Sequence, residues 1–145
     1  MKIDQTGKLV SSMPKDRVSN GLAQQAEDAI KKLTADWKPS EVNGKAVERC
    51  YMLVFSYKIF YNSLPVDYHA MAKKFEEKGK LDKAIRTYDD AIKMYPYEPV
   101  YYTMRAKYKK DLGDTAEAEA DKLKAEKLNM EVLGVVEIAQ SQSVR

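Results

Sequence analysis

The feature that most constrains this chain is an internal repeat at a fixed offset, the distance from Pro65 to Pro99. A series of landmark residues in one stretch returns in the next: Pro65, Val66, Tyr68, Ala72, Lys73, Gly79, Ala84 and Ala91 recur as Pro99, Val100, Tyr102, Ala106, Lys107, Gly113, Ala118 and Ala125. A repeat unit of this length is one helical hairpin, which cannot bury its apolar face alone and must stack on a neighbour. The repeat therefore predicts a function carried by a surface rather than by a catalytic pocket.

Proline and glycine mark the limits of the predicted helices. Pro65 and Pro99 open the first helix of each unit, and Gly79 and Gly113 end it. A second helix follows in each unit, and in the earlier unit it stops at Pro96. Proline at the start of a helix and glycine after its end are the expected arrangement.

Residues 1–64 lack the repeat. Residues 1–15 show no periodicity and predict an extended arm. Apolar residues three or four positions apart predict an amphipathic helix from Arg17 to Trp37. The next segment, residues 45–62, is much more apolar, and two structures compete for it.

The case for a strand in residues 45–62 is alternation. One set of apolar side chains falls at every second position: Tyr51, Leu53, Phe55, Tyr57, Ile59 and Tyr61. The case for a helix is length, because so long a segment without glycine or proline exceeds a usual strand. We predict a central buried helix, in which Cys50 would be an inert thiol. Cys50 and Tyr57 lie one repeat period before Ala84 and Ala91, so this helix could belong to an earlier, degenerate repeat.

The two units resemble the tetratricopeptide repeat (TPR) and cover residues 65–98 and 99–132. The resemblance implies an all-α fold, a right-handed solenoid of helical hairpins with two N-terminal helices and a C-terminal apolar tail. The chain would then divide into an N-terminal arm with two helices (1–64), two repeats (65–132) and a C-terminal arm (133–145). In the second unit Arg105, Lys109 and Lys122 replace large apolar residues of the family. They imply the polar outer face of a capping repeat.

The resemblance also implies a concave groove lined by the first helix of each unit. The residues placed in this groove are His69, Lys73, Glu76, Glu77, Thr103, Lys107 and Lys110. Lys73 and Lys107, one repeat apart, are suited to an acidic peptide of another protein. Family members that bind chaperone tails carry asparagine in this groove, and it is absent here. A merely solvated face is the alternative.

A second predicted contact surface combines tyrosines with the apolar tail, because tyrosine is enriched at protein interfaces. Its residues are Tyr95, Tyr97, Tyr101, Val132, Leu133, Val135 and Val136. Two repeats are fewer than a stable solenoid needs, so both ends require cover. Docking of the ends or arms on other copies would give a ring or a filament.

Composition and motifs exclude other classes of function. The 25 Lys and Arg are nearly balanced by 22 Asp and Glu, and their signs are interleaved, so we expect no nucleic-acid partner. No apolar run is long enough for a membrane span. His69 is the only histidine, and no metal-ligand spacing or phosphate loop is present, so we expect no cofactor and no metal. The N-terminal residues do not resemble a signal peptide, which leaves the compartment unknown and export of a longer precursor open.

The sequence thus predicts a non-catalytic, TPR-like protein that acts through protein–protein interaction. The leading hypothesis is a homo-oligomer or filament that assembles through solenoid ends and terminal arms. The alternative is an adaptor that binds a peptide in its groove. An enzyme with an unrecognised site in the N-terminal half is a third hypothesis.

Overall fold

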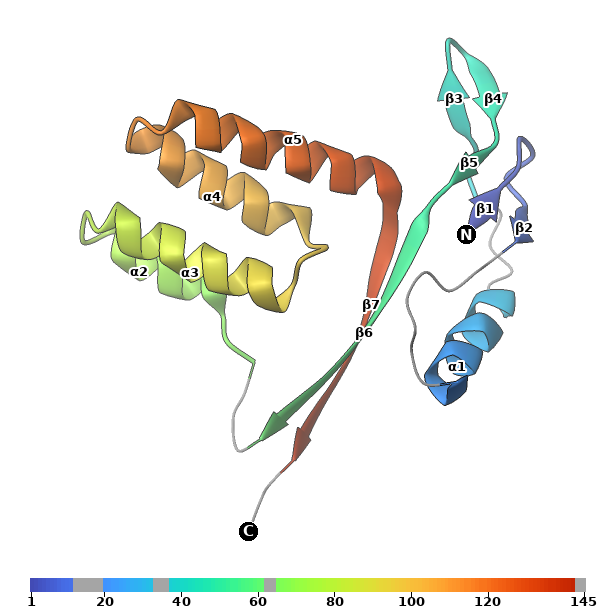
Figure 1. Ribbon diagram of the computed structural model, residues 1–145, viewed down its shortest axis with the longest axis horizontal. Helices are drawn as coiled ribbons and strands as arrows, with labels where there is room; N and C mark the ends of the chain where they lie inside the picture. The colour runs from blue at the N-terminus through green and yellow to red at the C-terminus, as the bar shows by residue number, and fades with distance from the viewer. Residues whose placement is uncertain (12–19, 33–36, 62–64, 143–145) are drawn as a thin grey trace.

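The computed structural model describes residues 1–11, 20–32, 37–61 and 65–142. Five helices and seven strands, the latter in three sheets, occur within these residues (Figure 1). The fold is therefore mixed α/β, and the prediction of an all-α solenoid is wrong. The error lies outside the repeats, in residues 1–61 and after residue 131, where strands replace the predicted arms and helix.

The N-terminal unit is built from short strands and one helix. Its first sheet is antiparallel, with β1 (Lys2–Ile3) between β2 (Leu9–Ser11) and β5 (Arg49–Cys50). The helix, α1, spans Asn20–Lys31 and lies within the helix predicted from Arg17 to Trp37, whose described residues Lys32 and Trp37 are not helical. Residues 12–19 and 33–36 lie outside the described residues.

A hairpin follows α1. Its strands are β3 (Ser40–Val42) and β4 (Lys45–Val47). Asn43 and Gly44, at the turn, both have positive φ, 52° and 73°. Asn-Gly is the pair that a two-residue hairpin turn of this hand favours.

The helix predicted over residues 45–62 is absent from residues 45–61, and residue 62 lies outside the described residues. Its residues form β4, β5 and then β6 (Met52–Tyr61), a strand of ten residues. β6 pairs in parallel with β7 (Val132–Gln142), which replaces the predicted C-terminal arm. Alternating aromatic and β-branched residues suit a strand that is half buried, and this preference outweighs the length argument. We call the β6–β7 pair the ribbon.

The repeats form two helical hairpins, which come between β6 and β7 in the sequence and lie together on one side of the ribbon (Figure 1). The four helices are α2 (Tyr68–Glu76), α3 (Leu81–Met94), α4 (Pro99–Asp111) and α5 (Thr115–Glu131). Gly79, which was predicted to end the first helix of its unit, has a φ of 64°, and Gly113 repeats it at 94°.

Small residues set the spacing of these helices. Six repeat alanines are at most 4% exposed: Ala72, Ala84, Ala91, Ala106, Ala118 and Ala125. An alanine lets two helix backbones approach more closely than a larger side chain does, and tyrosines fill the remaining space. Tyr88 and Tyr108 are fully buried, with their rings stacked at 5.8 Å. Burial raises the pKa of both phenols.

Candidate functional site

The ribbon has two chemically different faces, because side chains alternate along a strand and parallel partners share a face. The register pairs Val136 with Phe55. Among the residues whose side chains the structure describes, one face therefore carries only apolar and aromatic side chains, and we call it the outer face. Its described members are Leu53, Phe55, Tyr57, Ile59 and Val136.

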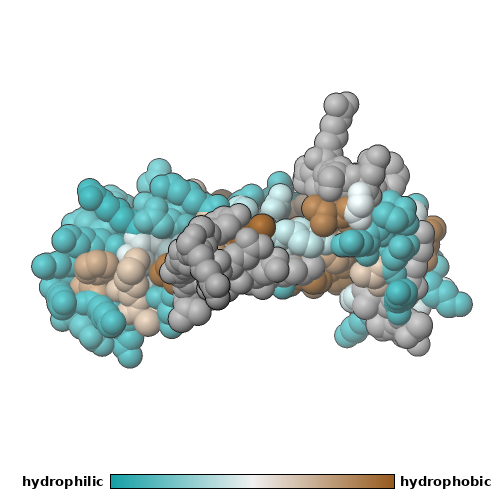
Figure 2. Space-filling view, turned by 90° about the horizontal axis from the view of Figure 1, so that it is seen from below, coloured by the Kyte–Doolittle hydropathy of each residue, from teal (hydrophilic) through white to brown (hydrophobic). Residues whose placement is uncertain are grey.

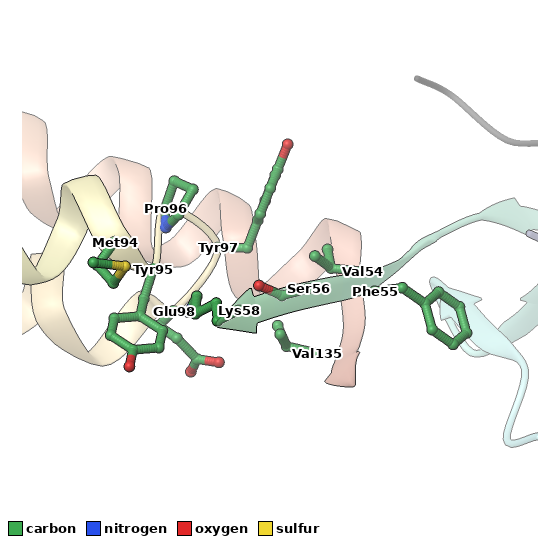
Figure 3. Close-up of a pocket in the computed structure, with 10 residues that line it drawn as sticks. All are labelled: Val54, Phe55, Ser56, Lys58, Met94, Tyr95, Pro96, Tyr97, Glu98 and Val135. Carbon is green, nitrogen blue, oxygen red and sulfur yellow. The ribbon is translucent and has the colours of Figure 1, made fainter. Parts of the chain in front are cut away.

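Solvent reaches much of the outer face. Ile59 is 52% exposed, and Tyr57 and Val136 are each 40% exposed. Phe55 points away from the side chains that face the helices (Figure 3). Figure 2 shows polar side chains over the loop end of the helical hairpins, on the left, and brown apolar side chains nearer the N-terminal strands. Clusters of exposed apolar residues of this kind mark interaction surfaces.

The opposite, inner face of the ribbon packs on the α3–α4 connection. Lys58 lies with its Nζ 3.1 Å from the centre of the Tyr95 ring, a cation–π contact. The same Nζ donates to Glu137 of β7 at 2.8 Å. The only two charged residues in the described sequence of the ribbon therefore neutralise each other on the inner face.

A small pocket of about 120 Å³ lies at this junction (Figure 3). Apolar side chains from the ribbon and from the α3–α4 connection with the end of α3 line it, among them Val54, Met94, Pro96 and Val135. Sites for small-molecule ligands usually measure about 300–1,000 Å³. The pocket is too small for a cofactor, and the ribbon–helix junction is best described as a packing interface.

The backbone of the ribbon is paired on one side only. β6 pairs with β7 and with no other strand among the described residues, and the same holds for β7. A two-stranded sheet is marginal on its own, and parallel strands normally have both faces covered. Here the helices cover the inner face alone.

The predicted contact residues divide between the helical core and the ribbon. Tyr95 and Tyr101 are half-buried, with rings 5.8 Å apart, and each lies about 6 Å from the Tyr68 ring. Burial raises the pKa of both phenols. Tyr97 packs on the cluster of Tyr102 and its neighbours. The tyrosines therefore serve mainly internal packing.

The other predicted contact residues, Val132, Leu133, Val135 and Val136, all lie on β7. Val136 is the most exposed of them and belongs to the outer face. The sequence interpretation missed the β6 half of this face, because it placed those residues in a buried helix. Their alternation was the signal that could have identified it.

The residues predicted to line a groove lie on α2 and α4, and several are engaged within the protein. Lys107 donates to Glu76 at 2.8 Å, and the Tyr108 hydroxyl donates to the other oxygen of Glu76 at 2.8 Å. The hydrogen bond to Glu76 raises the pKa of Lys107, and that from Lys107 lowers the pKa of Glu76. A carboxylate ligand would have to compete with this pair.

The remaining predicted groove residues are all exposed. His69 Nδ1 lies 3.0 Å from the Tyr88 hydroxyl, and its ring lies 5.3 Å from that of Tyr101. Thr103 donates to the carbonyl of Pro99, as a hydroxyl in a helix often does. Lys73, Glu77 and Lys110 are exposed.

Arg105 and Lys109 do not form the polar outer face that the resemblance implied. Arg105 of α4 donates to Asp121 of α5 through Nε and Nη2, at 2.8 and 2.5 Å, and to Asp89 of α3 at 2.7 Å. Lys109 lies 3.1 Å from both Asp121 and Glu117. Burial favours a raised pKa for Asp121, but the hydrogen bonds from Arg105 and Lys109 outweigh it and hold the pKa below 3.8. These charges join three helices.

The described residues offer few side chains for metal binding or nucleophilic catalysis. No group of three or more His, Cys, Asp or Glu within the described residues could hold a metal ion. Cys50 is exposed on β5, so the prediction of a buried thiol is wrong. No helix in the described part of the chain is both long and apolar enough to cross a membrane.

Comparison with known proteins gives no relative: no family model, curated protein or solved structure matches this chain.

Proposed function

We propose that this protein acts by protein–protein interaction and that it associates with copies of itself through the ribbon. The observation that carries the proposal is the outer face, whose described side chains are apolar or aromatic, uncharged and partly open to solvent. Parallel strands are stable where both faces are covered, and here the helices cover one. A second protein surface on the outer face would complete the arrangement.

A copy of the same chain is the partner that the side-chain chemistry favours. The two charges of the ribbon pair with each other on the inner face, so nothing on the outer face selects a charged ligand. An apolar face of this kind is complementary to another like itself. Self-association therefore requires only the outer face of the ribbon.

Light scattering across a concentration series tests this proposal with two variants. Ile59→Lys adds a charge to the outer face, and we expect it to abolish association while leaving the helical circular dichroism unchanged. The control is Leu123→Lys, because Leu123 is 60% exposed but lies on α5. Equal association of both variants and the wild-type chain would contradict a role for the ribbon.

The alternative is an adaptor that captures an acidic peptide between α2 and α4. It has weaker support, because one of the two repeat lysines, Lys107, already pairs with Glu76. The other, Lys73, is exposed and would have to supply most of the attraction. Titration with an acidic peptide, monitored by calorimetry, tests it. Binding that Lys73→Glu removes would favour the adaptor over self-association.

A further inference from the structure

Two phenols in the core of the helical hairpins each lie against a base. Tyr88 of α3 is 1% exposed, and its hydroxyl lies 3.0 Å from Nδ1 of His69 on α2. Tyr108 of α4 is also 1% exposed, and its hydroxyl donates to Glu76 at 2.8 Å. Phenylalanine would fill either space, so packing alone does not account for the two hydroxyl–base pairs.

The two bases differ in their capacity to take up a proton. With its hydrogen on Nε2, the neutral imidazole of His69 accepts the hydrogen bond from Tyr88 through Nδ1. Imidazole is in general a stronger base than a carboxylate. Glu76 is weaker still, because the hydrogen bond from Lys107 lowers the pKa of its carboxyl. Of the two phenols, Tyr88 therefore has the better proton acceptor.

Aromatic rings connect the buried Tyr88 to the surface. The ring centre of Tyr101, which is half-buried, lies 6.1 Å from that of Tyr88 and 5.3 Å from that of His69. Tyr101 in turn lies 5.8 Å from the ring of Tyr95. His69 itself is exposed. An electron can therefore leave Tyr88 through adjacent rings to an oxidant at the surface.

We infer that Tyr88 is a site of one-electron oxidation at which His69 accepts the proton. This inference concerns the helical hairpins and does not depend on the proposed self-association. An outer-sphere one-electron oxidant takes one electron from the phenol and is itself reduced by one electron. The O–H bond of Tyr88 breaks, and its proton forms an N–H bond at Nδ1 of His69. The products are a neutral tyrosyl radical and an imidazolium ion.

The transfer of the proton is what selects Tyr88. Oxidation of a phenol without a base would leave a positive charge in the core, and an unpaired buried charge is costly. The base moves this charge to His69, which water reaches. Without this effect, oxidation would follow exposure and fall on Tyr57, the most exposed tyrosine among the described side chains at 40%.

Flash oxidation by a photogenerated ruthenium(III) polypyridyl complex tests the inference in the full chain. A Cys50→Ser background removes the exposed thiol as a competing reductant. We expect electron paramagnetic resonance to detect a tyrosyl radical that Tyr88→Phe removes and the control Tyr57→Phe leaves unchanged. Circular dichroism confirms that each variant is folded.

His69→Gln separates proton uptake from hydrogen bonding and alters only an exposed helix position. The glutamine carbonyl can accept the hydrogen bond from Tyr88 but cannot take up its proton at neutral pH. We expect the Tyr88 radical to form about 100-fold more slowly, the low end of the usual effect of a positioned base. An unchanged rate would overturn the role of His69. A radical lost in Tyr57→Phe but kept in Tyr88→Phe would overturn the site itself.

Discussion

Replacement of Arg105 by methionine tests the most heavily connected charge in the described part of the protein. Arg105 is only 18% exposed and joins α4 to both α3 and α5 through Asp89 and Asp121. Methionine fills most of the volume but donates no hydrogen bond. Asp121, 7% exposed, then keeps its contact with Lys109 but loses both hydrogen bonds from the guanidinium.

The cost of this change can be bounded from the contacts. Breaking a buried ion pair by removing one partner costs about 3–5 kcal/mol. The loss here should be smaller, because Asp89 is 38% exposed and Lys109 still lies 3.1 Å from Asp121. We expect a loss of about 2 kcal/mol in the free energy of unfolding, or about 4–8 °C in Tm.

Urea denaturation monitored by circular dichroism in the far ultraviolet measures the effect. Lys122→Met is the matched control, because Lys122 lies on α5 in an exposed pair with Glu119, and its loss should change stability by less than about 0.5 kcal/mol. A double-mutant cycle with Asp121→Asn isolates the coupling between the two side chains. A loss for Arg105→Met no larger than that of the control would refute the assignment of Arg105 to the packing of three helices.

Three further predictions follow from the same structure. The pKa of Asp121 is lowered in the folded state, so its contribution to the free energy of unfolding is present above about pH 4 and is lost as the pH falls below 3.8. Urea denaturation at a series of acid pH values should show this loss in the wild type and less of it in Arg105→Met. Gly7→Ala should destabilise the N-terminal unit by about 2 kcal/mol, because Gly7 has a φ of 83° and a Cβ there would lie 1.9 Å from the Trp37 carbonyl oxygen. Fluorescence of Trp37, the only tryptophan, measures the unfolding of this unit. The control Gly21→Ala should not destabilise the protein, because the space around Gly21 is open. Ala84→Leu should cost about 1–3 kcal/mol in thermal unfolding by overpacking α2 against α3, whereas the same change at the exposed Ala116 should be near neutral.

The helical half of the fold could be predicted because its signals are local. Pro99 begins α4, and Gly79 and Gly113 take the positive φ that ends a hairpin's first helix. The buried alanines recur at the repeat spacing, so packing and sequence period agree. The resemblance to the tetratricopeptide repeat itself stays a prediction.

The ribbon could not be predicted, because its two strands are separated in the sequence by both helical hairpins and nothing in either strand specifies the other. Alternation from Leu53 to Ile59 was visible, but an apolar run of this length also fits a buried helix. The Asn43-Gly44 turn was a second, unused sign of β-structure.

The helix interpretation also affected the predicted site. It hid the outer residues Tyr57 and Ile59 inside a core, so only the β7 half of the surface was identified. Arg105 was misplaced for a related reason: its charge implied a solvated face, whereas Asp89 and Asp121 on neighbouring helices compensate for its burial. In both cases the structure depends on contacts between elements far apart in the sequence, the pairing of β6 with β7 and the ion pairs of Arg105.

Multi-angle light scattering of the wild-type chain tests the central claim most directly. From low micromolar to millimolar concentration, self-association through the outer face predicts a mass that rises above the 16.6 kDa of one chain. The Ile59→Lys variant should remain at 16.6 kDa throughout. A wild-type mass of one chain at every concentration would contradict the claim.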